Sequence, residues 1–136
     1  MKLIKEIKSK SGIVHFKRWK ILSLPWLSIY IHGIYKADTD KDLHNHPWSI
    51  WTMIIRGAYI EELHNDFKCL NSNRLRSFGH MAYCDTSKFH KIQKLLSEKV
   101  YTIAIVGKRQ KYEWGYITDD GFIDHIKYRK MKNENL

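Results

Sequence analysis

Two histidines, His44 and His46, are separated by one residue in the run LHNHPW. On a β-strand, side chains two residues apart point to the same face, so the two imidazoles would project together while Asn45 points away. Two imidazoles on one face are a ready-made bidentate clamp for a metal ion. Pro47 cannot donate a hydrogen bond to a neighbouring strand, which suits a strand end where a site can open. The run is therefore a candidate metal site, with a purely structural pair of histidines as the alternative.

The elements that must position these histidines read as short strands. Arg56-Gly57 divides two apolar runs, and Asp119-Asp120-Gly121 places glycine where a tight hairpin favours a positive φ. Many short β-rich runs separated by turns predict a mostly β protein, either a sandwich or a barrel. The predicted strands are Ile13 to Ile21, Leu27 to Ile31, Trp51 to Ile55, Ala58 to Leu63, Tyr101 to Val106, Tyr112 to Ile117 and Phe122 to Ile126.

One segment is ambiguous. The apolar residues Phe89, Ile92, Leu95 and Leu96 recur at spacings of three and four, which fit a helix face as well as a strand. His90 lies in this segment, so the sequence leaves open whether it is on a strand or a helix.

On these residues the chain resembles the cupin superfamily, and within it small, often phage-encoded cupin-like proteins with an HxHPW run, an apolar strand and a GxYxE turn. The resemblance continues through His90, residues 102 to 109, residues 114 to 116 and residues 121 to 128, and covers most of the chain from about Ile29. The matching residues of the first part are His44, His46, Pro47, Trp48, Trp51 to Ile55, Gly57, Tyr59 and Glu61.

The resemblance implies a jelly roll, also called a double-stranded β-helix. We expect one cupin-like domain over residues 1–136, with residues 130–136 as a frayed tail. The implied metal ligands are His44, His46 and His90. Three neutral imidazoles suit a divalent ion such as Fe, Zn, Mn or Ni and leave positions free for water or substrate. Pairing of two barrels into a homodimer is a further expectation from the family.

The sequence departs from the cupin pattern at two places. The usual glutamate after the second histidine falls on Ile50 or Trp51, neither of which binds metal, so the matched positions supply three nitrogen ligands at most. Asp85 and Ser87 replace the usual proline and glycine before His90. His80, beside Gly79, is a reserve candidate ligand. We assign no role to the four other histidines, His15, His32, His64 and His125.

Glu61 is the candidate catalytic residue. If the segment is a strand, Glu61 and Glu62 lie on opposite faces, so only one of them can face a barrel interior. By its parity with Tyr59, Glu61 is the one that matches the GxYxE pattern. A carboxylate there can serve as a general base or an extra metal ligand. A solvated glutamate on an edge strand is the alternative interpretation.

The candidate substrate-binding residues are aromatic or basic. Aromatic walls are typical of small-ligand pockets, although large aromatic side chains also simply fill small barrels. Arg109 lies in a tract of cations and aromatics that can stack a base and neutralise a phosphate, or that forms a strand with alternating exposure. The candidates are Trp48, Trp51, Tyr59, Arg109 and Trp114.

Composition limits the partners. Twenty-four basic and fourteen acidic residues give a formal charge of +10, which attracts phosphates, nucleotides or nucleic acid. Lysines predominate and are spread along the chain, which favours general surface charge over a nucleic-acid face. The apolar segment Ile21 to Ile31 is broken by Pro25 and is shorter than the ~20 residues that cross a bilayer, so we expect no membrane partner. Cys69 and Cys84 are too few for a disulfide framework, which indicates a reducing cytoplasm.

Three functions remain open at this stage. The first is a metal-dependent enzyme of the oxygenase, isomerase or hydrolase type that acts on a small polar or phosphorylated molecule. The second is a barrel that sequesters a nucleotide or other small molecule without turnover. The third is nucleic-acid binding that falls steeply with salt and does not depend on His44 or His46.

Overall fold

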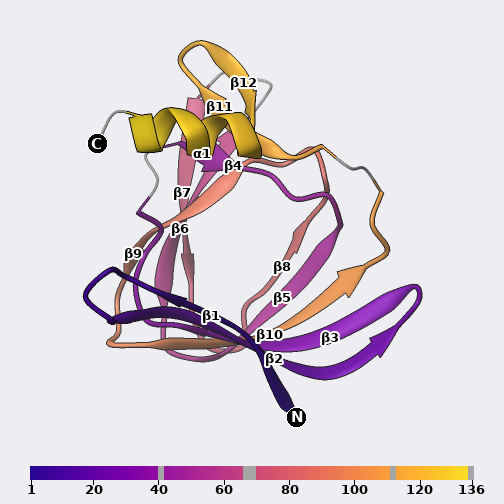
Figure 1. The fold of residues 1–136 in the computed structure, drawn as a ribbon. Helices are drawn as coiled ribbons and strands as arrows, with labels where there is room; N and C mark the ends of the chain where they lie inside the picture. Colours follow the sequence, from indigo (N-terminus) through magenta and orange to yellow (C-terminus); the bar gives the residue numbers. More distant parts are fainter. Residues whose placement is uncertain (40–41, 66–69, 111–112, 135–136) are drawn as a thin grey trace.

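A computed structural model describes residues 1–39, 42–65, 70–110 and 113–134. Strands form most of it, and one helix follows the last strand (Figure 1). The elements are β1 (Lys2–Lys8), β2 (Val14–Leu24), β3 (Leu27–Ile34), β4 (Leu43–His44), β5 (Ile50–Arg56), β6 (Tyr59–Asn65), β7 (Leu70–Arg76), β8 (Met81–Cys84), β9 (His90–Leu95), β10 (Val100–Gly107), β11 (Gly115–Thr118), β12 (Gly121–Asp124) and α1 (His125–Glu134).

The strands form two six-stranded sheets. The first sheet has the order β1-β2-β3-β10-β5-β8, and the second has the order β12-β11-β4-β9-β6-β7. Every pairing is antiparallel. The two sheets face each other across the interior (Figure 1). This arrangement confirms the predicted mostly β jelly roll.

The sequence located most of the inner strands, with shifted ends. Two of the predicted turns have the expected geometry, because Gly57 and Gly121 have φ of 86° and 98°. At Gly57 a Cβ would also approach the carbonyl oxygen of Lys99 too closely, so only glycine fits there. The start of the predicted strand at Tyr112 lies outside the described residues, as does Cys69.

The C-terminal end of the chain corrects a prediction. Residues 130–134 were expected to fray, but they continue helix α1, which begins at His125. The predicted last strand is shorter than expected because it ends at Asp124, where the helix starts. The Asp124 side chain accepts a hydrogen bond from the Ile126 amide at 2.9 Å, which satisfies a free N–H group of the first helical turn.

The hydrophobic core lies at one end of the barrel. Its buried residues come from the end of β3, the end of β5, the start of β6 and the start of β10. Because both sheets contribute, the core joins them at this end and leaves the interior beyond it free for a cavity. The core residues are Ile34, Ile54, Tyr59 and Val100, with Phe16, Ile92 and Leu95 packed against them.

Candidate metal centre

Three histidines meet inside the barrel. One ring nitrogen of each of His44, His46 and His90 lies within 4.8 Å of those of the other two. The Nε2 atoms of His46 and His90 are 2.9 Å apart. The chemistry of this donor set, three imidazole nitrogens converging on one point, fits a divalent transition metal and leaves further coordination positions open.

Strand pairing brings the cluster together. His44 is directly opposite His90 in the β4–β9 pair, so the ambiguous segment around His90 is a strand. β4 ends at His44, and His46 therefore lies just past the strand end, before the buried Pro47. The expected common direction of His44 and His46 is observed, since their ring centroids are 5.0 Å apart.

Asn45 holds this strand end in place. It is 2% exposed, and its Oδ1 accepts a hydrogen bond from the Gly115 amide at 2.8 Å. Its Nδ2 donates to the Thr86 carbonyl at 3.1 Å, and its own amide donates to the Gly115 carbonyl at 3.0 Å. The residue between the two histidines thus ties them to β11 and to the loop before β9.

Replacing Asn45 with alanine is expected to lower the free energy of unfolding by roughly 2–3 kcal/mol, because the buried Gly115 amide and the half-buried Thr86 carbonyl each lose a hydrogen bond. Urea denaturation of the metal-free protein measures this change. Asn73→Ala, on the exposed side of β7, is the matched control and should change stability by less than about 0.5 kcal/mol. Equal losses in the two variants would contradict the anchoring role of Asn45.

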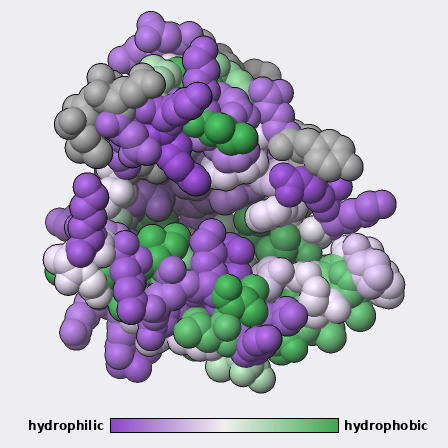
Figure 2. Space-filling model, viewed as in Figure 1, coloured by the Kyte–Doolittle hydropathy of each residue, from purple (hydrophilic) through white to green (hydrophobic). Residues whose placement is uncertain are grey.

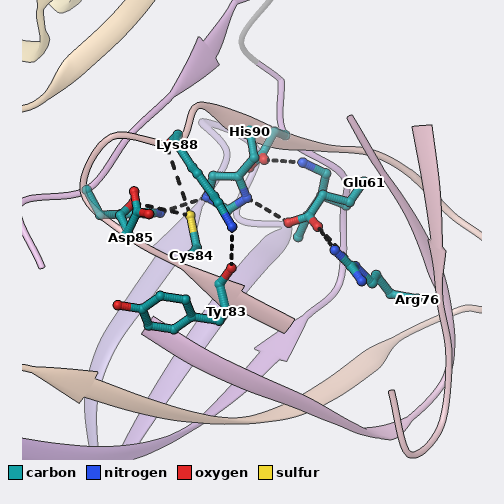
Figure 3. Close-up of polar contacts among 10 residues, drawn as sticks. Glu61, Arg76, Tyr83, Cys84, Asp85, Lys88 and His90 are labelled. Carbon is teal, nitrogen blue, oxygen red and sulfur yellow. Dashed lines mark hydrogen bonds and ion pairs between the residues drawn. The ribbon is translucent and has the colours of Figure 1, made fainter. Parts of the chain in front are cut away.

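A carboxylate orients the third histidine. The Nδ1–H of His90 donates to Oε2 of Glu61 at 2.8 Å, which leaves the His90 Nε2 lone pair facing the cluster. Oε1 of Glu61 accepts from the Nε and Nη2 atoms of Arg76, each at 3.0 Å. Figure 3 shows this chain of contacts from His90 through Glu61 to Arg76. Such carboxylate–histidine pairs fix the tautomer and direction of metal-binding imidazoles.

The contacts of Glu61 bear on its predicted catalytic role. Glu61 lines the cavity between the sheets and is only 6% exposed. Burial alone would raise the pKa of Glu61, but the hydrogen bond and charge of His90, together with Arg76, outweigh burial and lower it. Both oxygens are already engaged, so the geometry favours a positioning residue over a general base or metal ligand.

Burial favours the neutral form of His46. Burial lowers the pKa of His46 well below its ordinary value, and the neighbouring His90 and His44 lower it further. The neutral form is the one that binds metal. The protein therefore presents a deprotonated nitrogen at His46 at neutral pH.

A cavity of about 970 Å³ surrounds the cluster between the two sheets. Figure 2 shows the corresponding face of the molecule hollowed near its centre, with hydrophilic residues around much of the hollow. Basic residues predominate among the charged residues of the cavity wall that the structure describes. The basic ones are Lys5, Arg18, Lys36, Arg74, Arg76 and Lys88, and the acidic ones are Asp38 and Glu61.

Some of the predicted substrate-binding residues lie at this cavity. Trp48 and Tyr59 line it, although Tyr59 is also part of the core. Trp48 additionally borders a second, smaller cavity of about 210 Å³, and Arg109 lines only that one. The Arg109 guanidinium carbon lies 5.8 Å from the centre of a Trp48 ring.

Two predicted pocket residues lie elsewhere. Trp51 is 48% exposed and packs against Tyr83, its cross-strand neighbour, with ring centroids 4.8 Å apart. Trp114 stacks on His125 at the start of α1, with centroids 4.2 Å apart. Neither is among the residues that line the cavity. The sequence did not reveal the helix that covers Trp114 or the alternation that turns Trp51 outward.

The sequence also missed several groups that line the cavity. Arg76 was not singled out, and His32, which was assigned no role, lies on the wall with Arg18 and Thr102. Burial, together with the positive charges of Arg18 and Lys5, lowers the pKa of His32 to about 3. For Arg18, His32 and Thr102 the available signal was strand alternation, because each lies two residues from a core residue on the same strand.

The remaining histidines divide between the cavity wall and other contacts. His15 and His64 line the cavity but do not belong to the cluster. The reserve candidate His80 lies in an exposed turn, where its Nδ1 accepts a hydrogen bond from the Ser77 amide. His80 is therefore not one of the three histidines of the cluster.

Comparison with known proteins identifies the fold. No protein-family model matches the chain, and no curated protein matches it. A candidate mannose-6-phosphate isomerase from Ralstonia eutropha JMP134 superposes with a TM-score of 0.59 at 16% identity, over 68% of this chain and 84% of that one. KdgF from Halomonas sp. gives 0.57 at 16% identity, over 88% and 96%. Hydroxypropylphosphonic acid epoxidase from S. wedmorenis gives 0.56 at 10% identity, over 74% of this chain and 53% of that one.

The chain thus has the cupin-type double-stranded β-helix fold, with a histidine cluster in its interior. The narrower HxHPW grouping and a phage origin stay predictions from the sequence. Within the described residues, no helix combines the length and apolar character required to cross a lipid bilayer.

Proposed function

We propose that this protein is a metal-dependent enzyme that acts on a small anionic molecule, with His44, His46 and His90 as the metal ligands. The observation that carries the proposal is the convergence of their three ring nitrogens within 4.8 Å. The ion is Fe, Zn, Mn or Ni, as the donor set allows. HppE, another protein with this fold, has a crystal structure in its Fe(II) form.

The bound metal would supply Lewis-acid activation of a substrate oxygen or of water or dioxygen. The residues of the chain supply the rest. Glu61 and Arg76 keep the His90 ring in place, and Asn45 fixes the turn that presents His44 and His46. The two sheets enclose the site on both sides, and Trp48 packs beside His46 with ring centroids 6.4 Å apart.

The excess of basic residues on the cavity wall favours an anionic substrate. An excess of cations in a partly enclosed space concentrates anions there. Two proteins with this fold carry names that refer to a phosphorylated sugar or a phosphonic acid. At 16% and 10% identity those comparisons concern the fold alone, and the proposal depends on the residues of this chain.

Elemental mass spectrometry on protein purified without an affinity tag tests the proposal. We expect near-stoichiometric metal in the native protein and almost none in the double variant His44→Ala/His46→Ala. The control His64→Ala/His80→Ala removes the same number of imidazoles outside the cluster and should keep the metal. Native protein that stays metal-free after incubation with Fe(II), Zn(II), Mn(II) and Ni(II) would contradict the proposed metal-dependent activity. It would favour a barrel that binds its ligand without turnover.

A further inference from the structure

A row of polar side chains crosses the first sheet opposite the histidine cluster. In the strand pairs, Lys5 is opposite Arg18, Arg18 is opposite His32, and His32 is opposite Thr102. The row therefore runs over β1, β2, β3 and β10. All four side chains line the large cavity. Directly opposite residues lie about 5 Å apart, so neighbouring members of the row can contact one ligand group together.

The polar row begins where the hydrophobic core ends. A second row, made of apolar residues, lies two positions further along each of these strands. It is therefore on the same face of the sheet as the polar row. The apolar row is Ile7, Phe16, Ile34 and Val100. The change from apolar to polar side chains occurs on all four strands at once, and it marks the floor of the cavity.

Arg18 is held in this row by two aromatic rings and an imidazole. Its guanidinium carbon lies 5.7 Å and 5.1 Å from the ring centres of Phe16 and Tyr30. Its Nε donates to Nε2 of His32 at 3.0 Å. No carboxylate in the described part of the chain forms an ion pair with Arg18. A partly buried cation without a counter-charge is costly, and an anionic ligand would offset that cost.

Thr102 supplies an independent observation. Its side chain is 1% exposed, and its Oγ1 has no hydrogen-bond partner among the described residues. Buried hydroxyl groups are nearly always hydrogen-bonded, so an orphaned one on a cavity wall calls for a partner that enters the cavity. A hydroxyl donates readily to an oxyanion.

We propose that Arg18 and Thr102, with His32 between them and Lys5 at the open edge, bind the phosphate or phosphonate group of the substrate. The two neighbouring cations, Lys5 and Arg18, repel each other across the strand pair, and a dianion between them relieves that repulsion. A carboxylate carries only one charge and would relieve less of it. A phosphoryl group therefore fits the row better than a carboxylate does.

This inference rests on the proposed function in placing the reactive end of the substrate at the histidine cluster on the other sheet. The row and the histidine cluster line the same cavity, which lies between the two sheets. Facing sheets lie about 10 Å apart, a span that a phosphorylated molecule of a few carbon atoms bridges.

Calorimetric titration of the chelator-treated full chain with inorganic phosphate tests the anion site without the metal. We expect Arg18→Gln to weaken phosphate binding about tenfold or more, because a charged hydrogen-bond donor is lost. Thr102→Val keeps size and net charge and should weaken it severalfold. Arg56→Gln makes the same charge change at an exposed site away from the cavity and should leave the affinity unchanged.

The controls make each outcome decisive. Circular dichroism establishes that the variants fold, and Arg18→Lys, which keeps the charge, replaces Arg18→Gln if the latter does not. Equal phosphate affinities in the Arg18 and Arg56 variants, or no phosphate binding to the native chain, would overturn the site. Acetate binding as tightly as phosphate would overturn the assignment to a phosphoryl group.

The double variant His44→Ala/His46→Ala separates the two proposals. If the row is the anion site, this variant loses metal but keeps its affinity for phosphate. Phosphate binding by a protein that never takes up metal would refute the proposed enzyme and retain the anion site. Metal binding without any phosphate affinity would refute the anion site and leave the proposed enzyme standing.

Discussion

Replacing Glu61 with alanine should weaken metal binding about 10–100-fold and lower the free energy of unfolding by about 3 kcal/mol. The first effect arises because His90 loses the carboxylate that fixes its ring. The second arises because Arg76 is left mostly buried and without its partner. Metal titration with a competing chelator measures the affinity, and urea denaturation of the metal-free protein measures the stability.

Glu62 offers a matched control for this experiment. It lies on the other face of β6, where it accepts a hydrogen bond from Asn71 at 3.1 Å and pairs with Lys91 at 3.6 Å. Pairs of this kind contribute about 0–1 kcal/mol, so Glu62→Ala should change stability little and metal affinity not at all. A Glu61→Ala variant that binds metal as tightly as Glu62→Ala would refute the positioning role.

The metal-free protein should lose stability in acid through His32. Its pKa is about 3 in the folded state, against an ordinary value of 6.5. Between these values the unfolded chain binds a proton that the folded chain does not, so folding is favoured above pH 6.5 and weakened as the pH falls. One such proton changes the free energy of unfolding by about 1.4 kcal/mol per pH unit.

Urea denaturation between about pH 4.5 and 6.5 measures this slope, in a range above the usual titration of carboxylates. The variant His32→Gln can still accept the hydrogen bond from Arg18 but cannot titrate, so its slope should be shallower by one proton. His46, whose pKa is also lowered, continues to contribute to the slope in both proteins. His80→Gln, at an exposed turn, is the control, and an unchanged slope in His32→Gln would contradict the expectation.

The sequence predicted the strands whose two faces differ. β10 alternates between buried and half-buried residues along its length, and that alternation is legible without a structure. β1 and β7 escaped detection because they are edge strands with little or no buried face, and their residues are therefore mostly polar or charged. β4 has only two residues, too few for any periodicity to be recognised.

From spacing alone, the candidate site could be recognised only where its residues are close in sequence. His44 and His46 stand out through their spacing, and His90 through the family resemblance. Arg76 contacts Glu61 only because β6 pairs with β7 in one register, and Thr102 lies beside His32 only because β10 pairs with β3. Such cross-strand neighbours depend on register, which a single sequence does not specify when the strands are far apart along the chain.

The two groups of polar residues in the cavity belong to different sheets. His44, His90, Glu61 and Arg76 are on strands of the second sheet, whereas the polar row from Lys5 to Thr102 is on the first. Because the proposed anion-binding residues and the proposed metal ligands share no strand, substitutions in one group should leave the direct contacts of the other group in place. Substitutions on β2, β3 and β10 should therefore change which anion binds while the proposed metal ligands on the other sheet stay as they are.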